Sequence, residues 1–347
     1  MQKILNPVQK ETCYVVMVNY NGWKDTIECL ESVLKSDYKN YKIIVCDNAS
    51  GNDSWDRMID WASGGIQASC SDHPKIRSLV YPLLPKPVDF DCQYQDKDKP
   101  FILTNAKIHF LKLKKNLGFA GGMNMGIRLA LQDKDCGYIW CLNNDTVVES
   151  SVMRRMIATI KENMDCGICS SYSRPYDDLY FNELPNIRFY FNKWLANDIA
   201  YNGENKNKLF YYDGASFMVC RKFVERVGLM EESYFLYHEE PDWTIRGKRK
   251  GYKIVFDPEG LVYHKGGQST GGKKKAASYL ADYYMIRGRI LITKKFFPYC
   301  LPTVYLSFIG AIIHRIQRKQ YNRIWMILKL MINPRPLLKI SDKEEKK

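Results

Sequence analysis

The chain has 347 residues, of which 46% are hydrophobic and 13% aromatic, and this composition excludes an intrinsically disordered chain. The formal net charge is +14, yet residues 273–347 alone hold 17 Lys and Arg against four acidic residues. A nearly neutral body with a basic tail argues against a nucleic-acid-binding protein and points to an anionic surface, with a membrane as the leading candidate.

The predicted elements begin with a strand, a turn and a helix. Residues 14–18 are a continuous apolar run, and apolar side chains then recur at helical spacing over residues 25–36. A second apolar run covers residues 41–46 and is closed by polar turn-forming residues at 47–52. This order predicts a βαβ unit with a parallel sheet, in which ligands bind beyond the carboxyl ends of the strands.

The regular pattern is broken over about residues 64–106, where five prolines and mixed charges predict a surface insertion. It resumes with a strand over 108–113, a glycine-containing turn, a helix from about Met123 to Leu131 and a strand over 138–142. Alternating strands and helices predict an α/β fold.

Further elements follow toward the C-terminal region. We expect a strand over 210–221 that is interrupted at 213–215, a helix over 223–227 and a helix with Pro241 in its first turn. A last strand over 253–256 leads to His264.

An uncharged run of 18 residues lies between Lys295 and His314, but Pro298 and Pro302 break it. The prolines leave an expected helix of about 11 residues, or about 16 Å, which is short of the ~30 Å hydrocarbon core. We therefore expect this tail to dock at the membrane interface through its cationic flanks rather than to span the bilayer. The alternative is a helical subdomain packed on the body or on a partner.

The eleven cysteines are an odd number, and several lie in strand-like runs, so we expect free thiols. Cys166 and Cys169 form the single CxxC, and the absence of a second pair or a nearby His disfavours zinc. The start of the chain lacks the apolar core of a secretory signal, and a reducing cytoplasmic location is expected.

Three groups of residues carry candidate chemistry. Asp145 follows a buried strand, where a carboxylate can hold Mg²⁺ or Mn²⁺ together with phosphate oxygens or can cap a loop. Glu239, Glu240 and Asp242 crowd a helix start, which suits either N-terminal capping or a carboxyl with a raised pKa that acts as a general base. His264 precedes a glycine-containing loop, where a side chain can reach a ligand or be purely structural.

Seven motifs occur in order along the chain: NYNG, DNASGND, NLGFAGGMNMGI, NNDTVV, DGASFMVCR, YFLYHEEPDW and GYKIVFDPEGLVYHKGG. Over about residues 14–272, except the insertion, they resemble the family 2 glycosyltransferases of GT-A fold, most closely the rhamnosyltransferase-like group of bacterial surface polysaccharide synthesis. The resemblance implies a Rossmann-like, mixed but mainly parallel sheet flanked by helices for residues 1–272. For residues 273–347, which the resemblance does not cover, the composition predicts a basic, apolar helical region that associates with a membrane.

The resemblance also implies site residues. On the donor side they are Asn19, Tyr20 and Asn21 against the nucleotide, Asp47 reading the base, Gly121, Gly122 and Asn124 near the ribose and sugar, and Asn143 and Asn144, the first two positions of a DxD motif whose last position is Asp145. Asp145 and His264 are the implied metal ligands. On the acceptor side, Glu240 is the implied catalytic base with Glu239 as a second candidate, and Asp213, Gly214 and Asp242 are near the substrate.

The implied reaction is an inverting, metal-dependent sugar transfer, with dTDP-rhamnose as the expected donor and a UDP-sugar as the runner-up. The implied acceptor is a glycan on a polyprenyl diphosphate at the cytoplasmic face of the inner membrane. Asn143, where the motif has Asp, keeps open a non-catalytic nucleotide-sugar-binding or scaffold relative. A sugar nucleotidyltransferase is disfavoured because no glycine-rich phosphate loop follows the first strand.

Overall fold

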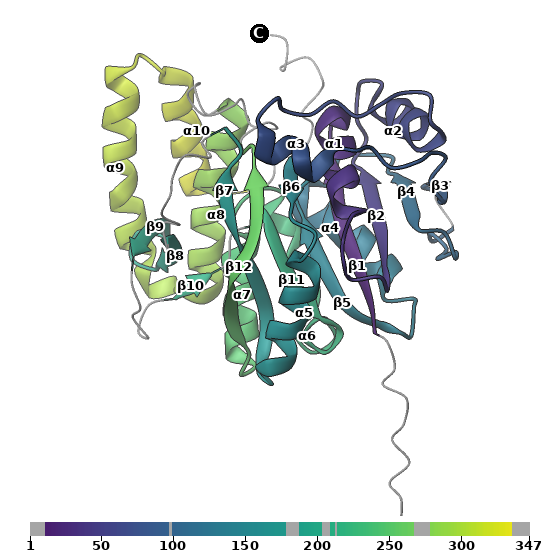
Figure 1. The fold of residues 1–347 in the computed structure, drawn as a ribbon. Coiled ribbons are helices and arrows are strands. Elements are labelled where there is room, and N and C mark those ends of the chain that lie inside the picture. The colour runs from purple at the N-terminus through teal and green to yellow at the C-terminus, as the bar shows by residue number, and fades with distance from the viewer. Residues whose placement is uncertain are drawn as a thin grey trace, which may run out of the picture.

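The computed structural model describes residues 11–96, 99–177, 187–202, 209–211, 214–266 and 278–334. Its centre is a nine-stranded sheet in the order β3-β4-β2-β1-β5-β11-β7-β12-β6, with helices on both faces (Figure 1). The strands are β1 (Thr12–Asn19), β2 (Tyr41–Asp47), β3 (Phe90–Tyr94), β4 (Ile108–Lys112), β5 (Cys136–Leu142), β6 (Thr146–Val148), β7 (Cys166–Pro175), β11 (Ser216–Cys220) and β12 (Lys253–His264). This arrangement confirms the predicted fold class.

The direction of the strands determines where polar residues meet. Strands β1 to β5 are parallel, β7 and β12 are parallel to each other, and β11 runs antiparallel between β5 and β7. Strand β6 is antiparallel to β12. The carboxyl ends of β1, β2, β5 and β12 and the start of β11 therefore lie at one edge of the sheet, called the carboxyl edge below.

The sheet is buried on both faces because its strands are apolar at nearly every position. In β1, Val15 and Met17 pack into one core, while Tyr14 and Val16 pack into the core on the opposite face. The first core is covered by α1 (Trp23–Val33), α2 (Ser54–Ser63) and α5 (Val152–Glu162), and the second by α4 (Gly118–Ala130), α6 (Arg221–Val227) and α7 (Glu239–Arg249).

The predicted insertion at 64–106 is only partly irregular. It contains α3 (Pro74–Val80), and its residues Phe90–Tyr94 form β3, which pairs in parallel with β4 and extends the main sheet. The sequence pattern hid this strand because an edge strand with only one neighbour keeps polar side chains such as Asp91 and Gln93.

Helix α4 begins at Gly118, five residues before the predicted start, so the glycine-containing motif lies inside the helix. Its glycines allow close packing on the sheet. A Cβ at Gly122 would lie 2.9 Å from a methyl group of Val18, and one at Gly126 would collide with Val16.

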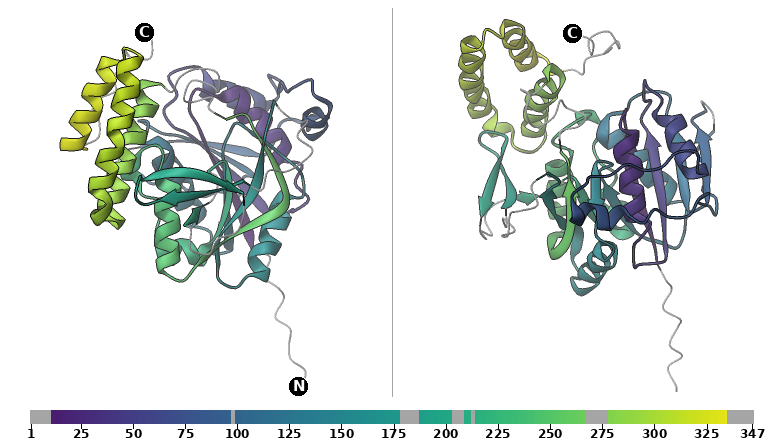
Figure 2. Two further views of the ribbon diagram at one scale, coloured as in Figure 1. Left: turned by 90° about the vertical axis from the view of Figure 1, so that its left-hand side faces the viewer. Right: turned by 45° about the horizontal axis from the view of Figure 1, so that its top comes forward.

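A second unit stands beside the main sheet (Figure 2). It consists of a small antiparallel sheet, in the order β10-β8-β9, and three helices. Their bounds are β8 (Ile187–Asn192), β9 (Asn197–Asn202), β10 (Phe210–Tyr211), α8 (Tyr279–Phe296), α9 (Leu301–Gln317) and α10 (Tyr321–Ile332), with short 3₁₀ turns η1 (Glu232–Tyr234) and η3 (Pro298–Cys300). The described part of the tail is thus helical, and its inner residues share one core with Tyr234 and Ile245 of the body.

Helix α9 has 17 residues, so the predicted length of about 11 is wrong. Pro302 lies in the first turn, where a missing N–H costs no helical hydrogen bond, and the helix continues beyond it. Residues Pro298–Gln317 are long and apolar enough to cross a membrane, and only 17% of this apolar window is buried. The tail therefore has a large apolar surface that the described residues leave uncovered.

Candidate active site at the carboxyl edge of the sheet

The ends of β1 and β2 are joined by a buried polar network. The Asn19 Nδ2 donates to Asp47 Oδ1 at 2.8 Å and to Ser50 Oγ at 3.1 Å, and Thr26 Oγ1 donates to Asn19 Oδ1 at 2.9 Å. Asn19 and Asp47 are both fully buried. The network fixes the two strand ends to each other, and the implied contact of Asp47 with a nucleotide base stays a prediction.

The first two motifs form one structural unit. Asn21 has a left-handed backbone with φ of 57°, and its Oδ1 accepts from the Gly51 N–H at 2.8 Å. Its own N–H donates to Ser50 Oγ at 2.9 Å, beside the half-buried Tyr20. The loops that follow β1 and β2 therefore lie against each other at the carboxyl edge. The region beyond this edge, where open α/β sheets bind ligands, is called the crevice below.

Asp145 and His264 face each other in this crevice. The antiparallel pairing of β6 with β12 places His264 opposite Thr146, and the His264 Nε2 lies 3.2 Å from Asp145 Oδ1. The two side chains remain 23% and 11% exposed, so the pair is accessible from solvent. A carboxylate oxygen and an imidazole nitrogen at this distance are donors that a divalent cation accepts.

Lys265 anchors the end of β12, a role that the sequence analysis missed. Its Nζ lies 2.5 Å from both Asp25 and Glu28 of α1, and Tyr176 donates to Glu28 at 2.6 Å. Burial favours a lower pKa for Lys265, but the Glu28 and Asp25 carboxylates outweigh it and hold the pKa above its usual value. These contacts hold Lys265, the residue next to His264, against α1.

Asn143 links the loop that carries Asp145 to the start of β11. Its backbone N–H donates to the Ala215 carbonyl at 2.9 Å, and its Oδ1 is buried with no hydrogen-bond partner among the described residues. Asn144 points the other way and donates to Thr26 at 2.9 Å. The orphaned Asn143 oxygen is a group that a ligand in the crevice can satisfy.

Gly214 brings the acidic helix into the same crevice. Its backbone lies against the carboxylate of Glu240, at the start of α7, so closely that an added Cβ would collide with Glu240 Oε1. Because Ala215, next to Gly214, is hydrogen-bonded to Asn143, Glu240 and the loop that carries Asp145 lie at the same end of the sheet. The other residue predicted in this segment, Asp213, lies outside the described residues.

The two neighbouring glutamates differ in exposure. Glu239 is 2% exposed, its Oε2 has no hydrogen-bond partner in the described part of the chain, and burial raises its pKa to about 7. Glu240 is half-buried and lies toward Gly214. Of the two candidates for a base, only Glu240 has surface with which to contact an acceptor.

Asp242 has a structural role, which corrects its prediction as a substrate-binding residue. It is fully buried, with Oδ1 2.6 Å from Arg246 and Oδ2 2.7 Å from Lys295. Tyr234 donates to the same Oδ2 at 3.0 Å. Asp242 therefore ties α7 to α8 and has no surface left for a substrate.

The donor residues predicted on α4 are also used for packing. A Cβ at Gly121 would lie 2.6 Å from Leu117, and Gly122 lies against Val18. Asn124 is fully buried and donates from Nδ2 to the Met230 carbonyl and to Glu232, both at 2.9 Å. We therefore leave these three residues out of the proposed donor site.

The loop before α7 has an unusual backbone. Phe235, Tyr237 and His238 have φ of 69°, 66° and 73°, a region that side chains other than glycine rarely adopt. Three such residues within four positions, directly before Glu239 and Glu240, need support from their surroundings. We call residues 231–238 the acidic-helix loop.

Helix α8 supplies much of this support. The Tyr284 ring stacks on Phe235 with centroids 4.6 Å apart, and Gly288 packs directly on the imidazole of His238. Arg287 donates to the Ser233 carbonyl at 2.5 Å and to the Pro334 carbonyl, just beyond α10, at 3.0 Å. The tail helices therefore hold the loop that positions Glu240.

No group of three or more His, Cys, Asp or Glu side chains that could hold a metal occurs within the described ranges. Cys166 and Cys169, the pair in the CxxC, are both buried in β7. Asp145 and His264 are thus the candidate protein ligands, and a bound diphosphate would have to supply others.

Comparison with known proteins gives a family match and similar proteins. The family model described as Glycosyl transferase family 2 matches residues 14–73 and 91–228, more than half of the chain, and omits only 74–90 of the predicted insertion. The chain is 26% identical over 149 residues to the low-salt glycan biosynthesis hexosyltransferase Agl10 of Haloferax volcanii, covering 42% of this chain and 48% of that protein. It is 23% identical over 213 residues to the dTDP-rhamnosyl transferase RfbF of Shigella flexneri, covering 60% of this chain and 70% of that protein.

Two solved structures share the fold. GalNAc-T7, determined with UDP, GalNAc and Mn²⁺, has a TM-score of 0.52 and 14% identity, over 80% of this chain and 47% of that chain. The mannosyltransferase PcManGT of Pyrobaculum calidifontis, determined with GDP-Man and Mn²⁺, has a TM-score of 0.50 and 12% identity, over 93% and 85%. The chain spans about half the length of the Haloferax relative and of the GalNAc-T7 chain.

Proposed function

Since the chain belongs to glycosyl transferase family 2 and is a glycosyltransferase, we propose that it moves a sugar from a nucleoside diphosphate donor to a glycan hydroxyl in one inverting displacement. The convergence of Asp145, His264 and Glu240 at the carboxyl edge of the sheet is the observation that carries this proposal. It also argues against the non-catalytic relative, because candidate residues for both metal binding and proton removal lie at this edge.

The proposed roles follow from exposure and charge. Glu240 takes the proton from the attacking acceptor hydroxyl, because it is the acid of its pair that has accessible surface. Asp145 and His264 fit Mn²⁺ or Mg²⁺, which when bound supplies positive charge to the departing diphosphate. Lys265 does not compete for this role, since Asp25 and Glu28 already pair with it.

The proposed donor is dTDP-rhamnose, supported by the similarity to RfbF, and its test is a panel of dTDP-, UDP- and GDP-sugars. We expect turnover of the dTDP-sugar that stops on addition of EDTA and returns with Mn²⁺ or Mg²⁺. Turnover of a UDP-sugar instead would change the proposed donor to that sugar nucleotide. If no sugar nucleotide bound with either metal, the proposal would be overturned.

Replacing Asp145 by Asn is expected to weaken Mn²⁺ binding by roughly 10- to 100-fold and to lower transfer at least as much, because a carboxylate ligand is lost. Calorimetric titration of Mn²⁺ in the presence of the nucleoside diphosphate measures the first effect. Asp37→Asn is the matched control, since Asp37 forms an exposed pair with Arg154 before β2 begins. Equal Mn²⁺ affinity in the two variants would contradict the metal assignment.

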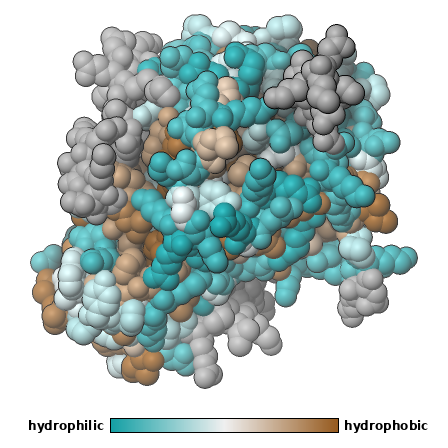
Figure 3. Space-filling model, turned by 90° about the horizontal axis from the view of Figure 1, so that it is seen from below, coloured by the Kyte–Doolittle hydropathy of each residue, from teal (hydrophilic) through white to brown (hydrophobic). Residues whose placement is uncertain are grey.

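We also propose that the protein lies on the cytoplasmic face of the inner membrane through α9 and α10, with a polyprenyl-diphosphate-linked glycan as acceptor. On α9, Leu306, Ile309, Ile313 and Ile316 recur on one face and are 64%, 54%, 50% and 50% exposed. Seen from below, hydrophobic side chains gather on the side of the molecule where α9 stands (Figure 3). Basic residues follow at Arg318 and Lys319 and suit anionic headgroups.

The double substitution Ile309→Asp and Ile313→Asp should lower sedimentation with anionic phospholipid vesicles by about tenfold or more, because each apolar side chain contributes about 1.5–3 kcal/mol when fully buried. Donor hydrolysis should not change. Ile102→Asp is the control, because Ile102 is 66% exposed on the body and not on the tail. If Ile102→Asp lowered sedimentation as strongly, α9 would not be the docking face.

A further inference from the structure

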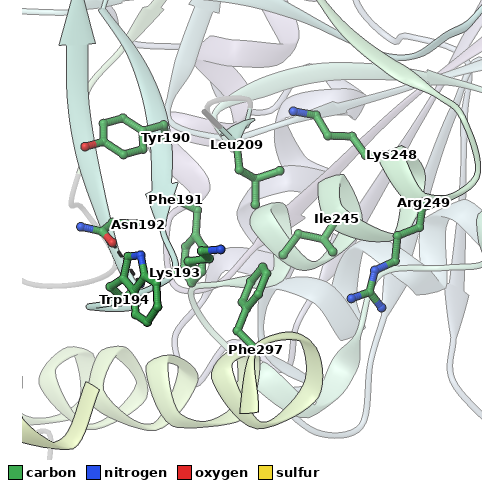
Figure 4. A pocket seen from close by; sticks show the side chains of 10 residues that line it. All are labelled: Tyr190, Phe191, Asn192, Lys193, Trp194, Leu209, Ile245, Lys248, Arg249 and Phe297. Atoms are coloured by element: carbon green, nitrogen blue, oxygen red, sulfur yellow. Dashed lines mark hydrogen bonds between the residues drawn. The ribbon is translucent and has the colours of Figure 1, made fainter. Parts of the chain in front are cut away.

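A cavity of about 530 Å³ lies between the small sheet, the last turn of α7 and the end of α8 (Figure 4). It belongs neither to the crevice at the carboxyl edge nor to the exposed face of α9. Glu240 and Lys248 are eight residues apart on α7, so the cavity is about 12 Å along the helix from the proposed base.

The floor of the cavity is apolar and well packed. Phe191 of β8 stacks on Phe297, at the end of α8, with ring centroids 6.1 Å apart. Phe191 and Ile245 are 3% and 5% exposed. Phe297 and Leu209, which also line the cavity, are half-buried, so the floor presents apolar surface through them and suits a hydrocarbon chain.

The rim of the cavity is cationic. Lys193, Lys248 and Arg249 all line it, and none of the three forms an ion pair within the described part of the chain. Two neighbouring basic residues differ in this respect, because Arg246 and Lys295 both form ion pairs with Asp242. Three charges around one opening, with no carboxylate among the described residues that line it, provide complementarity for an anion.

One residue that lines the cavity contacts the start of α9. Trp194, which also lines it, is 50% exposed and meets Tyr299 edge-on with centroids 6.1 Å apart. The Trp194 carbonyl accepts from Thr303 in the first turn of α9 at 2.7 Å. Exposed Trp and Tyr side chains are typical of the membrane interface, so the opening lies next to the proposed docking face.

We propose that this cavity binds the phosphate-bearing end of a lipid, with the phosphates at Lys193, Lys248 and Arg249 and the first apolar units of the chain on the Phe191 and Phe297 rings. The inference rests on the proposed function, because the lipid would be the carrier of the glycan acceptor. It adds a second site, separate from the donor site, that holds the carrier while the glycan reaches Glu240.

The test uses the full chain and calorimetric titration with three probes: farnesyl diphosphate, farnesol and inorganic diphosphate. EDTA is present, so that a metal-bound diphosphate in the donor site does not contribute. We expect farnesyl diphosphate to bind at least about tenfold more tightly than either farnesol or inorganic diphosphate. Only farnesyl diphosphate has both a hydrocarbon chain for the apolar floor and phosphates for the cationic rim. Inorganic diphosphate binding as tightly as farnesyl diphosphate would overturn the proposal.

Lys248→Glu should weaken farnesyl diphosphate binding by about tenfold or more, since it replaces an attraction by a repulsion. Lys250→Glu is the matched control, because it makes the same charge change two residues on, at an exposed position that does not line the cavity. Equal affinities of the two variants would overturn the proposal. Thermal unfolding of both variants shows whether the fold is kept.

Donor hydrolysis, measured on the same preparations, separates the two proposals. Lys248→Glu should hydrolyse the donor as the wild type does, so loss of farnesyl diphosphate binding at unchanged hydrolysis supports the cavity. If the wild type turned over no donor but still bound farnesyl diphosphate in a Lys248-dependent way, the proposed function would fail and the lipid site would stand.

Discussion

Glu240→Gln is expected to lower sugar transfer by roughly 10²- to 10⁴-fold while the variant still binds the donor with its metal, because the amide cannot take a proton from the acceptor hydroxyl. The substitution keeps the size of the side chain, so the contact with Gly214 is retained. Transfer to a glycan acceptor measures the first effect, and donor titration with Mn²⁺ measures the second. Transfer within threefold of the wild type would rule out Glu240 as the base.

The control is the same substitution one residue earlier. Glu239→Gln should keep transfer activity, since Glu239 is 2% exposed, but it should change the pH dependence of stability. Burial raises the pKa of Glu239 from 4.5 to about 7, so the folded state holds the proton more tightly than the unfolded state does. In the wild type, the contribution of Glu239 to the free energy of unfolding is fully present below about pH 4.5 and is lost as the pH rises through 7.

Glu239→Gln removes this pH-dependent loss of stability. The variant should therefore be more stable than the wild type at pH 8, by up to about 3 kcal/mol, and the difference should vanish near pH 4.5. Urea unfolding at the two pH values measures it. If Glu239→Gln instead abolished transfer at unchanged stability, the two glutamates would have to exchange roles.

Gly288→Val is expected to lower sugar transfer, although Gly288 lies on α8 in the tail and no tail residue that the structure describes belongs to the proposed crevice. A Cβ at Gly288 would collide with His238, so the valine must displace the acidic-helix loop and with it Glu240. Overpacking of this kind costs about 1–3 kcal/mol, and we expect transfer to fall at least about tenfold. Gly288→Ala should have a smaller effect of the same kind.

Gly310→Val tests whether a larger side chain in the tail is harmful in itself. Gly310 lies on α9, and an added Cβ there meets no atom within 4 Å. Transfer should therefore be unchanged in detergent solution, while thermal unfolding of Gly288→Val shows that the assay is made on folded protein. Full activity of Gly288→Val would show that α8 does not position the loop.

The boundary between a catalytic domain at 1–272 and a separate tail remains a prediction. The packing of α8 shows, however, that the tail is in close contact with the rest of the chain. Two of these contacts join Asp242 to Lys295 and His238 to Gly288. The residues of each pair are about 50 positions apart in the sequence, and the sequence pattern does not predict that they meet. The sequence could therefore predict a helical tail, but not that it supports the acidic-helix loop.

The parts of the site that could be predicted are those attached to strand ends. Asp145 and His264 each follow a short apolar run, but it was the resemblance to the glycosyltransferases, and not the strand pattern, that paired them as implied metal ligands. The structure places the two side chains 3.2 Å apart. Exposure could not be predicted in this way. The motif placed Glu239 and Glu240 side by side, and only the packing around α7 distinguishes a buried acid from an accessible one.

The free cysteines of the sheet have a practical consequence. Burial raises the pKa of Cys46, in β2, to about 12 and places that of Cys141, in β5, still higher, so in the folded protein at pH 7 only roughly one Cys46 thiol in 10⁵ is the reactive thiolate. Alkylation must then wait for the strands to open. Because Cys13, Cys46, Cys141 and Cys169 lie on four different strands, the rate of label uptake at each would give the opening free energy of β1, β2, β5 and β7 separately, without any introduced probe.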